Sequence, residues 1–216
     1  PASVLAFSAG AAEHAAVARG LESRPHPPLR IAVRLTDLIV DNTRALFGSA
    51  DIRVDALAIT RLPPNAGEPY QAKTLPPFHD IKDGERLPLD NALLYFGEVR
   101  DFVDLRIWVS RHRDDAKTLS ELFQAELNSS EFQGAASAVL ALTAAAPQAA
   151  VIVAATGAAA TLGKVAWKLL SQALPKSIGV YQTSLLAVDG FNIGRHPAQG
   201  LLRAQGFSLG YEVKAV

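Results

Sequence analysis

The residues of this 216-residue chain that most strongly suggest chemistry are five aspartates in the predicted connections between strands. They are Asp41, Asp51, Asp83, Asp114 and Asp115. If the strands alternate in direction, these connections share one end of the fold, where clustered carboxylates would supply the oxygen ligands that Ca²⁺ prefers. We take Asp41, Asp51, Asp114 and Asp115 as candidate calcium ligands and expect no other cofactor. The alternative is local: Asp83-Gly84 forms a turn, Asp114 or Asp115 caps a helix, and Asp51 ends a loop.

A run without any charged side chain, residues 132–163, is the second candidate for function. It predicts an Ala-rich helical hairpin that contacts a membrane or a partner, and three residues typical of a membrane boundary follow it. The candidate contact residues are Val151, Ile152, Val153, Lys164, Trp167 and Lys168. However, Pro147 divides the run into pieces shorter than the roughly 20 residues that a spanning helix needs. This favours the alternative, a hairpin packed on the sheet or against another subunit.

A Gly-rich loop over residues 190–206 contains the third candidate, Arg195 and His196. Loops of this length often carry function, and the cations predict contact with an anionic group of a partner. The alternative is an ordinary long connection with turn-forming glycines.

Several classes of protein are excluded or disfavoured by what the sequence contains. With no cysteine there is no disulfide or thiol catalysis, and the five histidines lack metal-ligand spacing. Residues 157–164 resemble a phosphate-binding loop, but one residue too many separates the glycines and Val165 replaces the required hydroxyl. No nucleophile elbow is present. Because 21 basic and 21 acidic residues balance, no overall field attracts nucleic acid.

Hydrophobic residues alternate with polar ones over several segments, which predicts about seven strands. The expected strands are 29–36, 51–60, 71–82, 85–96, 103–110, 178–188 and 207–216. The change of phase near Ala56 is typical of a bulge. Asp83-Gly84 predicts a hairpin turn, and Pro76-Pro77 predicts an edge or interrupted strand.

The pattern changes to a helical period after residue 116. Thr118 and Glu121 have the spacing of a capping box, and a later helix should begin near Pro147 and end before Pro175. We therefore expect an antiparallel β-sandwich over residues 29–216 with a helical insertion at about 117–174. Residues 1–28 form an N-terminal arm with a Pro-rich linker. The first residues lack the basic region of a signal peptide, so we expect a cytoplasmic protein.

Two segments resemble the C2-type β-sandwich family. Residues 29–54 are similar to that family's opening strand, its first aspartate loop and the entry to its next strand. Asp104-Leu105-Arg106-Ile107-Trp108-Val109 resembles the strand before its third loop. The resemblance implies a C2-like fold and calcium-dependent lipid binding. The chain departs from the family pattern at residues 110–113, where Ser-Arg-His-Arg replaces the usual Asp-x-Asp pair.

Together these features predict a non-enzymatic interaction module that binds a membrane surface or a protein partner. A bacterial membrane-active effector and a regulatory domain both fit this description. The alternative class is a self-assembling structural subunit, in which the Ala-rich hairpin packs against copies of itself. A hydrolase is the least expected function.

Overall fold

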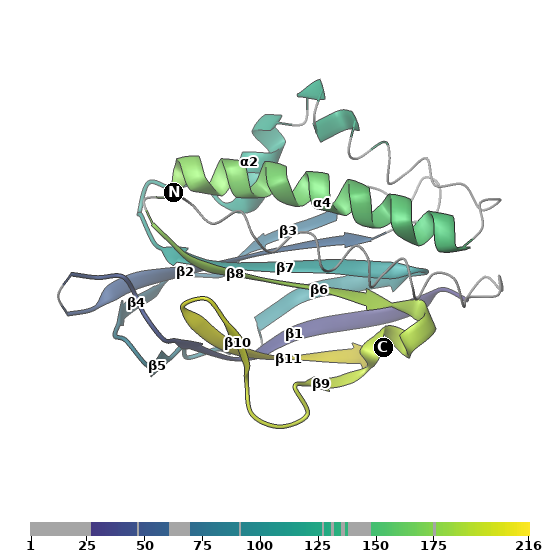
Figure 1. Cartoon of the computed structure of the whole chain (residues 1–216). Helices are drawn as coiled ribbons and strands as arrows, with labels where there is room; N and C mark the ends of the chain where they lie inside the picture. Colours follow the sequence, from purple (N-terminus) through teal and green to yellow (C-terminus); the bar gives the residue numbers. More distant parts are fainter. Residues whose placement is uncertain are drawn as a thin grey trace.

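The computed structural model shows a β-sandwich covered on one side by helices (Figure 1). The structure describes residues 27–46, 48–60, 70–90, 92–126, 128–130, 132–134, 137, 148–174 and 176–216. In the long helix over 148–173, side chains are described at residue 157 and from 160 onward. The predicted arm of residues 1–28 lies outside the described residues except for its last two positions.

Two antiparallel sheets form the sandwich. Sheet A contains β1 (Leu29–Val40), β5 (Glu85–Arg86), β6 (Ala92–Val99), β9 (Gly194–His196), β10 (Leu202–Ala204) and β11 (Phe207–Ala215). Sheet B contains β2 (Ala50–Thr60), β3 (Tyr70–Thr74), β4 (Phe78–Ile81), β7 (Phe102–Arg111) and β8 (Ser177–Leu186). This arrangement confirms the predicted mainly β fold with a helical insertion, and it is compatible with a C2-like sandwich.

The inner faces of the two sheets bury the main hydrophobic core. Ile31, Val33 and Leu35 of β1 are at most 2% exposed, as their alternation with polar residues predicts. On sheet B, the side chains that face the same core include those of Val103, Leu105, Ile107 and Val109. All four are fully buried. Local alternation therefore predicted correctly which residues face the sandwich interior.

Two predicted strands are each divided in the structure. Leu75-Pro76-Pro77 separates β3 from β4, because proline has no N–H to donate to a sheet ladder. Residues 87–90, which contain Pro88, similarly follow β5 before β6 begins, and both of these strands pair with β1. The loop at 190–206 adds two short strands, β9 and β10, which pair with β11.

The change of phase in β2 has a different cause from the predicted bulge. β2 pairs with β7 in unbroken register from Ile52 to Thr60, so no bulge lies at Ala56. Instead, both faces of this strand are buried. Val54 and Ala56 face the sandwich core, whereas Leu57 and Ile59 belong to a second core beneath the helices.

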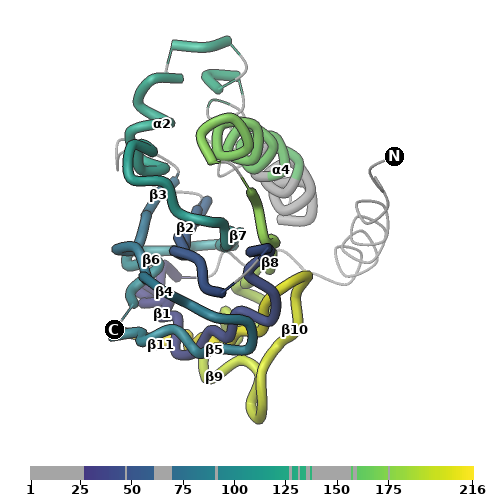
Figure 2. The backbone as a smooth tube through the Cα atoms, turned by 90° about the vertical axis from the view of Figure 1, so that its left-hand side faces the viewer, coloured from purple at the N-terminus to yellow at the C-terminus, as the bar shows by residue number. Residues whose placement is uncertain are grey.

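The helical layer lies on the outer face of sheet B, as the end-on view shows (Figure 2). It includes α2 (Leu119–Glu126) and α4 (Gln148–Ala173), while the short 3₁₀ helix η2 (Ala187–Asn192) follows β8. The expected capping box begins α2: the Glu121 N–H donates to the Thr118 hydroxyl at 3.2 Å, and the Thr118 N–H donates to the Glu121 carboxylate at 2.7 Å. The rest of the predicted hairpin, from 138 to 147, lies outside the described residues.

Apolar side chains of α4 form the second core with sheet B. The buried residues of α4 are Leu162, Val165, Ala166, Leu169 and Leu170. They recur at the three- and four-residue spacing of one helix face and pack with Trp108 of β7, which is 2% exposed. The described apolar side chains of α4, from Leu162 onward, are therefore packed on sheet B, and the membrane contact of the charge-free run stays a prediction.

Two ion pairs are buried in the same layer. Arg53 donates to both carboxylate oxygens of Asp55 at 2.8 Å, and Arg106 Nε donates to Asp104 at 2.9 Å. All four residues are at most 4% exposed. Removing one partner of either pair would leave the other as an uncompensated buried charge. Both pairs therefore keep their side chains in place beneath the helices.

Candidate functional site

The sandwich has two open sides, and each holds a cavity. On one side β8 of sheet B lies near β10 of sheet A, and on the other β3 lies near β6 (Figure 2). The larger cavity, about 670 Å³, lies on the β8 side beneath α4. We call it the α4–β8 groove and define it by its lining residues, which are Arg44, Trp167, Lys176, Ser177, Ile178, Gly179, Val180 and Gln205.

The connection between β1 and β2 places Arg44 at this groove. The Thr43 N–H and hydroxyl both donate to Asp83 Oδ1 at 2.7 Å, which ties this connection to the turn before β5. These two donors hold the pKa of Asp83 below its ordinary value. Arg44 follows with a positive φ of 55°, and its Nη2 donates to the carbonyl oxygen of Ile178 at 3.1 Å.

The turn between β10 and β11 closes one part of the groove against β8. A Cβ atom at Gly179 would lie 1.9 Å from the carbonyl oxygen of Gln205, so only glycine allows this approach. The contact packs this turn against the beginning of β8. Farther along β8, the side chain of Val180 is 44% exposed, and Gln182 is also exposed.

The opposite wall of the groove is α4. Trp167 lies at the border of its buried face and is 43% exposed. Lys164 is exposed three residues earlier, which places it on the same side of the helix as Trp167. The groove thus combines exposed apolar surface from Trp167 and Val180 with cations from two separate segments, Arg44 and Lys176.

The electrostatics of the groove favour a negatively charged ligand. Among the described residues that line it, Arg44 and Lys176 are cations and none is acidic. Asp104 of β7 is buried and bound to Arg106, Gln182 and Ser184. Its charge is therefore already compensated within the protein.

The predicted contact residues fall into three groups. Trp167 lines the groove, and Lys164 and Lys168 are exposed on the same helix. Val151, Ile152 and Val153 lie in the first turns of α4, where only the backbone is described. Arg195 and His196 belong instead to β9 in sheet A, where His196 stacks on Tyr211 with ring centroids 4.9 Å apart. Their contact with a membrane or a partner stays a prediction.

The candidate calcium ligands each have a separate partner. Asp41 accepts from the Ser208 hydroxyl at 3.0 Å, and Asp114 lies 3.5 Å from His112. Asp115 forms an ion pair with Arg113, which holds the pKa of this carboxyl below its ordinary value. Calcium binding by Asp41, Asp51, Asp114 and Asp115 stays a prediction. No group of three or more His, Cys, Asp or Glu side chains in the described ranges is arranged to hold a metal ion.

Asp51 has the most extensive contacts of these four aspartates. The backbone N–H of Asp80 donates to its carboxylate at 3.0 Å and lowers its pKa, although partial burial opposes that change. His79 lies 3.3 Å away and acts in the same direction as the Asp80 amide. The His112 N–H also donates to the Asp51 carbonyl at 2.7 Å. These bonds join the beginning of β2 to β4 and to the residue after β7, at one end of sheet B.

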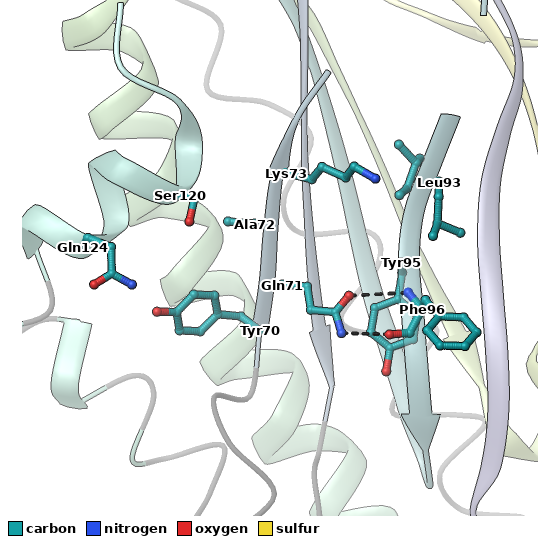
Figure 3. Close-up of a pocket in the computed structure, with 10 residues that line it drawn as sticks. Tyr70, Gln71, Ala72, Lys73, Leu93, Tyr95, Phe96, Ser120 and Gln124 are labelled. Atoms are coloured by element: carbon teal, nitrogen blue, oxygen red, sulfur yellow. Dashed lines mark hydrogen bonds between the residues drawn. The ribbon is translucent and has the colours of Figure 1, made fainter. Parts of the chain in front are cut away.

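The smaller cavity, about 310 Å³, lies between β3 and β6 beside α2 (Figure 3). The Gln71 side chain crosses it, donating to the Phe96 carbonyl at 3.0 Å and accepting from the Phe96 N–H at 3.4 Å. This amide satisfies the β6 edge much as a neighbouring strand would. Lys73 is the only charged residue among those described in its lining, so this cleft has less capacity for charge recognition than the α4–β8 groove.

Comparison with protein-family models and with curated proteins finds no match for this sequence. In the described ranges, no helix is both long enough and apolar enough to cross a membrane. The functional interpretation therefore depends on the geometry of the groove.

Sequence reasoning found Trp167 and Lys164 but missed Arg44, Lys176 and Val180. Single cations and a valine at the beginning of a strand are common in any globular protein, and nothing in their spacing marks them. Arg44 and Ile178 are separated by 134 positions, so only folding brings them together.

Proposed function

We propose that this chain is a non-enzymatic interaction module that holds a segment of a protein partner in the α4–β8 groove. One observation carries the proposal: Trp167 and Val180 expose apolar surface in a groove whose described charged lining residues are both cations. Aromatic residues in concave, partly desolvated sites commonly dominate binding energy. An adjacent charge then favours partners of the opposite sign.

The groove favours a protein segment over the membrane surface that the sequence also suggested. The apolar side chains of α4 from Leu162 onward are packed on sheet B and so are not available to enter lipid. The side chains that the described part of the helix leaves exposed include Trp167, Lys164 and Lys168, and Trp167 lines a concave cavity. A concave surface of this size fits a short stretch of polypeptide better than the flat face of a bilayer.

A displayed library of random peptides tests this proposal. Peptides would be selected on the wild-type protein and then measured on Trp167→Ala and Val180→Asp. Phe96→Ala is the matched control, because Phe96 is 42% exposed, close to the 43% of Trp167, but lies at the other open side of the sandwich.

We expect selected peptides that lose binding to the two groove variants and keep it with Phe96→Ala. Thermal unfolding of all variants checks that they remain folded. Peptides that bind every variant equally, or selection that yields no groove-dependent peptide, would overturn the proposed function.

A further inference from the structure

We infer that the α4–β8 groove takes an extended acidic peptide, which adds as a strand along the free edge of β8. This inference rests on the proposed function and specifies the partner's chemistry and conformation. Three features of the described residues carry it: the position of β8 in sheet B, the sign of the surrounding charge, and the apolar pair Trp167 and Val180.

β8 ends sheet B and has one free edge. The order of the sheet is β3-β2-β7-β8, and within the described residues β8 pairs only with β7. An edge strand presents unpaired N–H and C=O groups that can bind another extended chain. Among the described residues, Arg44 occupies this edge at the carbonyl oxygen of Ile178. The edge from Val180 onward is where an added strand would pair.

On the opposite side of the sandwich, a side chain forms hydrogen bonds with the backbone groups of an edge strand. There the Gln71 amide bonds both backbone groups of Phe96 and occupies the edge of β6. No side chain in the described ranges makes an equivalent pair of bonds to β8 beyond Ile178. The two edges therefore differ at the described side chains: Gln71 bonds both backbone groups of one β6 residue, whereas Arg44 bonds one carbonyl oxygen of β8.

The charges around the β8 edge select an acidic strand. Lys176 lies at the beginning of the edge, Arg44 lies beside Ile178, and Lys164 projects on the Trp167 side of α4. Alternate side chains of an added strand would point toward α4, because strand side chains alternate between faces. Acidic residues there would meet these cations, and an apolar residue would contact Trp167 and Val180.

The test uses three capped ten-residue peptides on the full chain, measured by calorimetry at low salt. The first alternates Glu with Val and Phe. In the second, every Glu is replaced by Gln. The third keeps the Glu residues but is N-methylated at alternate positions, which removes the N–H groups that pair with an edge.

The matched protein variants are Lys176→Glu in the groove and Lys214→Glu on β11 of sheet A. Both change the net charge by the same amount, and both lysines are exposed. We expect the acidic peptide to bind, the other two to bind at least about tenfold more weakly, and Lys176→Glu to weaken binding by about tenfold. Lys214→Glu should change binding less than about twofold.

Equal binding of the Glu and Gln peptides would overturn the acidic assignment, and equal binding of the N-methylated peptide would overturn strand addition. Failure of all three peptides would also overturn the inference. Vesicles containing an anionic phospholipid provide the remaining comparison. Vesicle binding that Lys176→Glu abolishes, with no peptide binding, would replace the inference with a membrane surface. If the library instead yields groove-dependent peptides that are neutral or basic, the proposed function stands and this inference fails.

Discussion

The guanidinium group of Arg106 lies against the backbone of α4 at Gly163, where a Cβ atom would fall 1.7 Å from Nη1. Arg106 is 4% exposed, and its Nε donates to the buried Asp104 at 2.9 Å. Because the arginine cannot move aside without disturbing that ion pair, Gly163 sets how closely α4 approaches sheet B. α4 is also one wall of the groove, so this contact helps to position Trp167.

Replacing this glycine should loosen the helical layer. We expect Gly163→Ala to lower the free energy of unfolding by about 2 kcal/mol or more, because the new methyl group displaces a buried, ion-paired arginine. Chemical denaturation measures this change. Gly157→Ala on the same helix is the matched control.

Among the residues that the structure describes, no atom outside the helix lies within 4 Å of a Cβ built at Gly157. Alanine there should raise the free energy of unfolding by about 0.5–1 kcal/mol, because glycine is the poorer helix former. Similar effects of the two substitutions would show that Arg106 does not restrict the approach of α4.

Asp83 should make the loop that contains Arg44 sensitive to acid. Hydrogen bonds from Thr43 lower its folded pKa below the ordinary value of 3.8. The resulting stabilisation is present above the unfolded pKa and is lost as the pH falls through the lower folded pKa. We expect the stability difference between wild type and Asp83→Asn to be constant near neutral pH and to shrink below about pH 4, as measured by denaturation from pH 7 to pH 2.5.

Thr43→Val tests the hydroxyl group of Thr43 separately from its backbone N–H. It removes the hydroxyl group but leaves the backbone N–H that also binds Asp83. The acid dependence should therefore become weaker without disappearing. The role assigned to this carboxylate would be contradicted by one result. The stability difference between wild type and Asp83→Asn would stay the same throughout the acid range.

The fluorescence of Trp167 should report the charge of the groove. The chain has two tryptophans, and Trp108 is only 2% exposed, so soluble quenchers reach mainly Trp167. We expect iodide to quench more efficiently than caesium, because nearby cations concentrate anions. High salt should reduce this preference by screening.

Two variants control the quenching measurement. Trp167→Phe leaves only Trp108, which neither ion should quench strongly. Combined Lys164→Glu and Lys176→Glu should reverse the preference toward caesium. If iodide and caesium quench the wild type equally, the groove does not have the positive potential that the binding proposal requires.

Gln71 should protect the edge of β6. Gln71→Ala frees the N–H and C=O of Phe96, and we expect a loss of at most about 1 kcal/mol in stability, because water can replace the lost bonds. The exposed edge should also increase self-association, which sedimentation velocity measures as a function of concentration. Gln71→Asn is the control, since it keeps the amide but shortens its reach. A strictly monomeric Gln71→Ala protein at high concentration would argue that the side chain does not protect this edge.

The sequence predicted the sandwich because its strongest signals are local. Val103 to Val109 alternate so regularly that the inward face of β7 could be assigned without a structure, and Thr118 with Glu121 marked the beginning of α2. The same reasoning misread β2, where Leu57 and Ile59 break the alternation. A strand buried on both faces has no polar face to define a period, and a sequence does not reveal that a helix covers the second face.

The sequence by itself determined where strands and helices form, which faces are apolar, and that the chain has no cysteine chemistry. Those properties depend on neighbours within a few positions, through backbone geometry and hydrophobic period. Only the tertiary structure decided that α4 covers the buried pair of Arg106 and Asp104, that Arg195 and His196 lie in a different sheet from the one that α4 covers, and that Arg44 reaches the beginning of β8. A binding groove arises where distant segments meet, and that meeting is decided by the packing of the whole core rather than by local sequence.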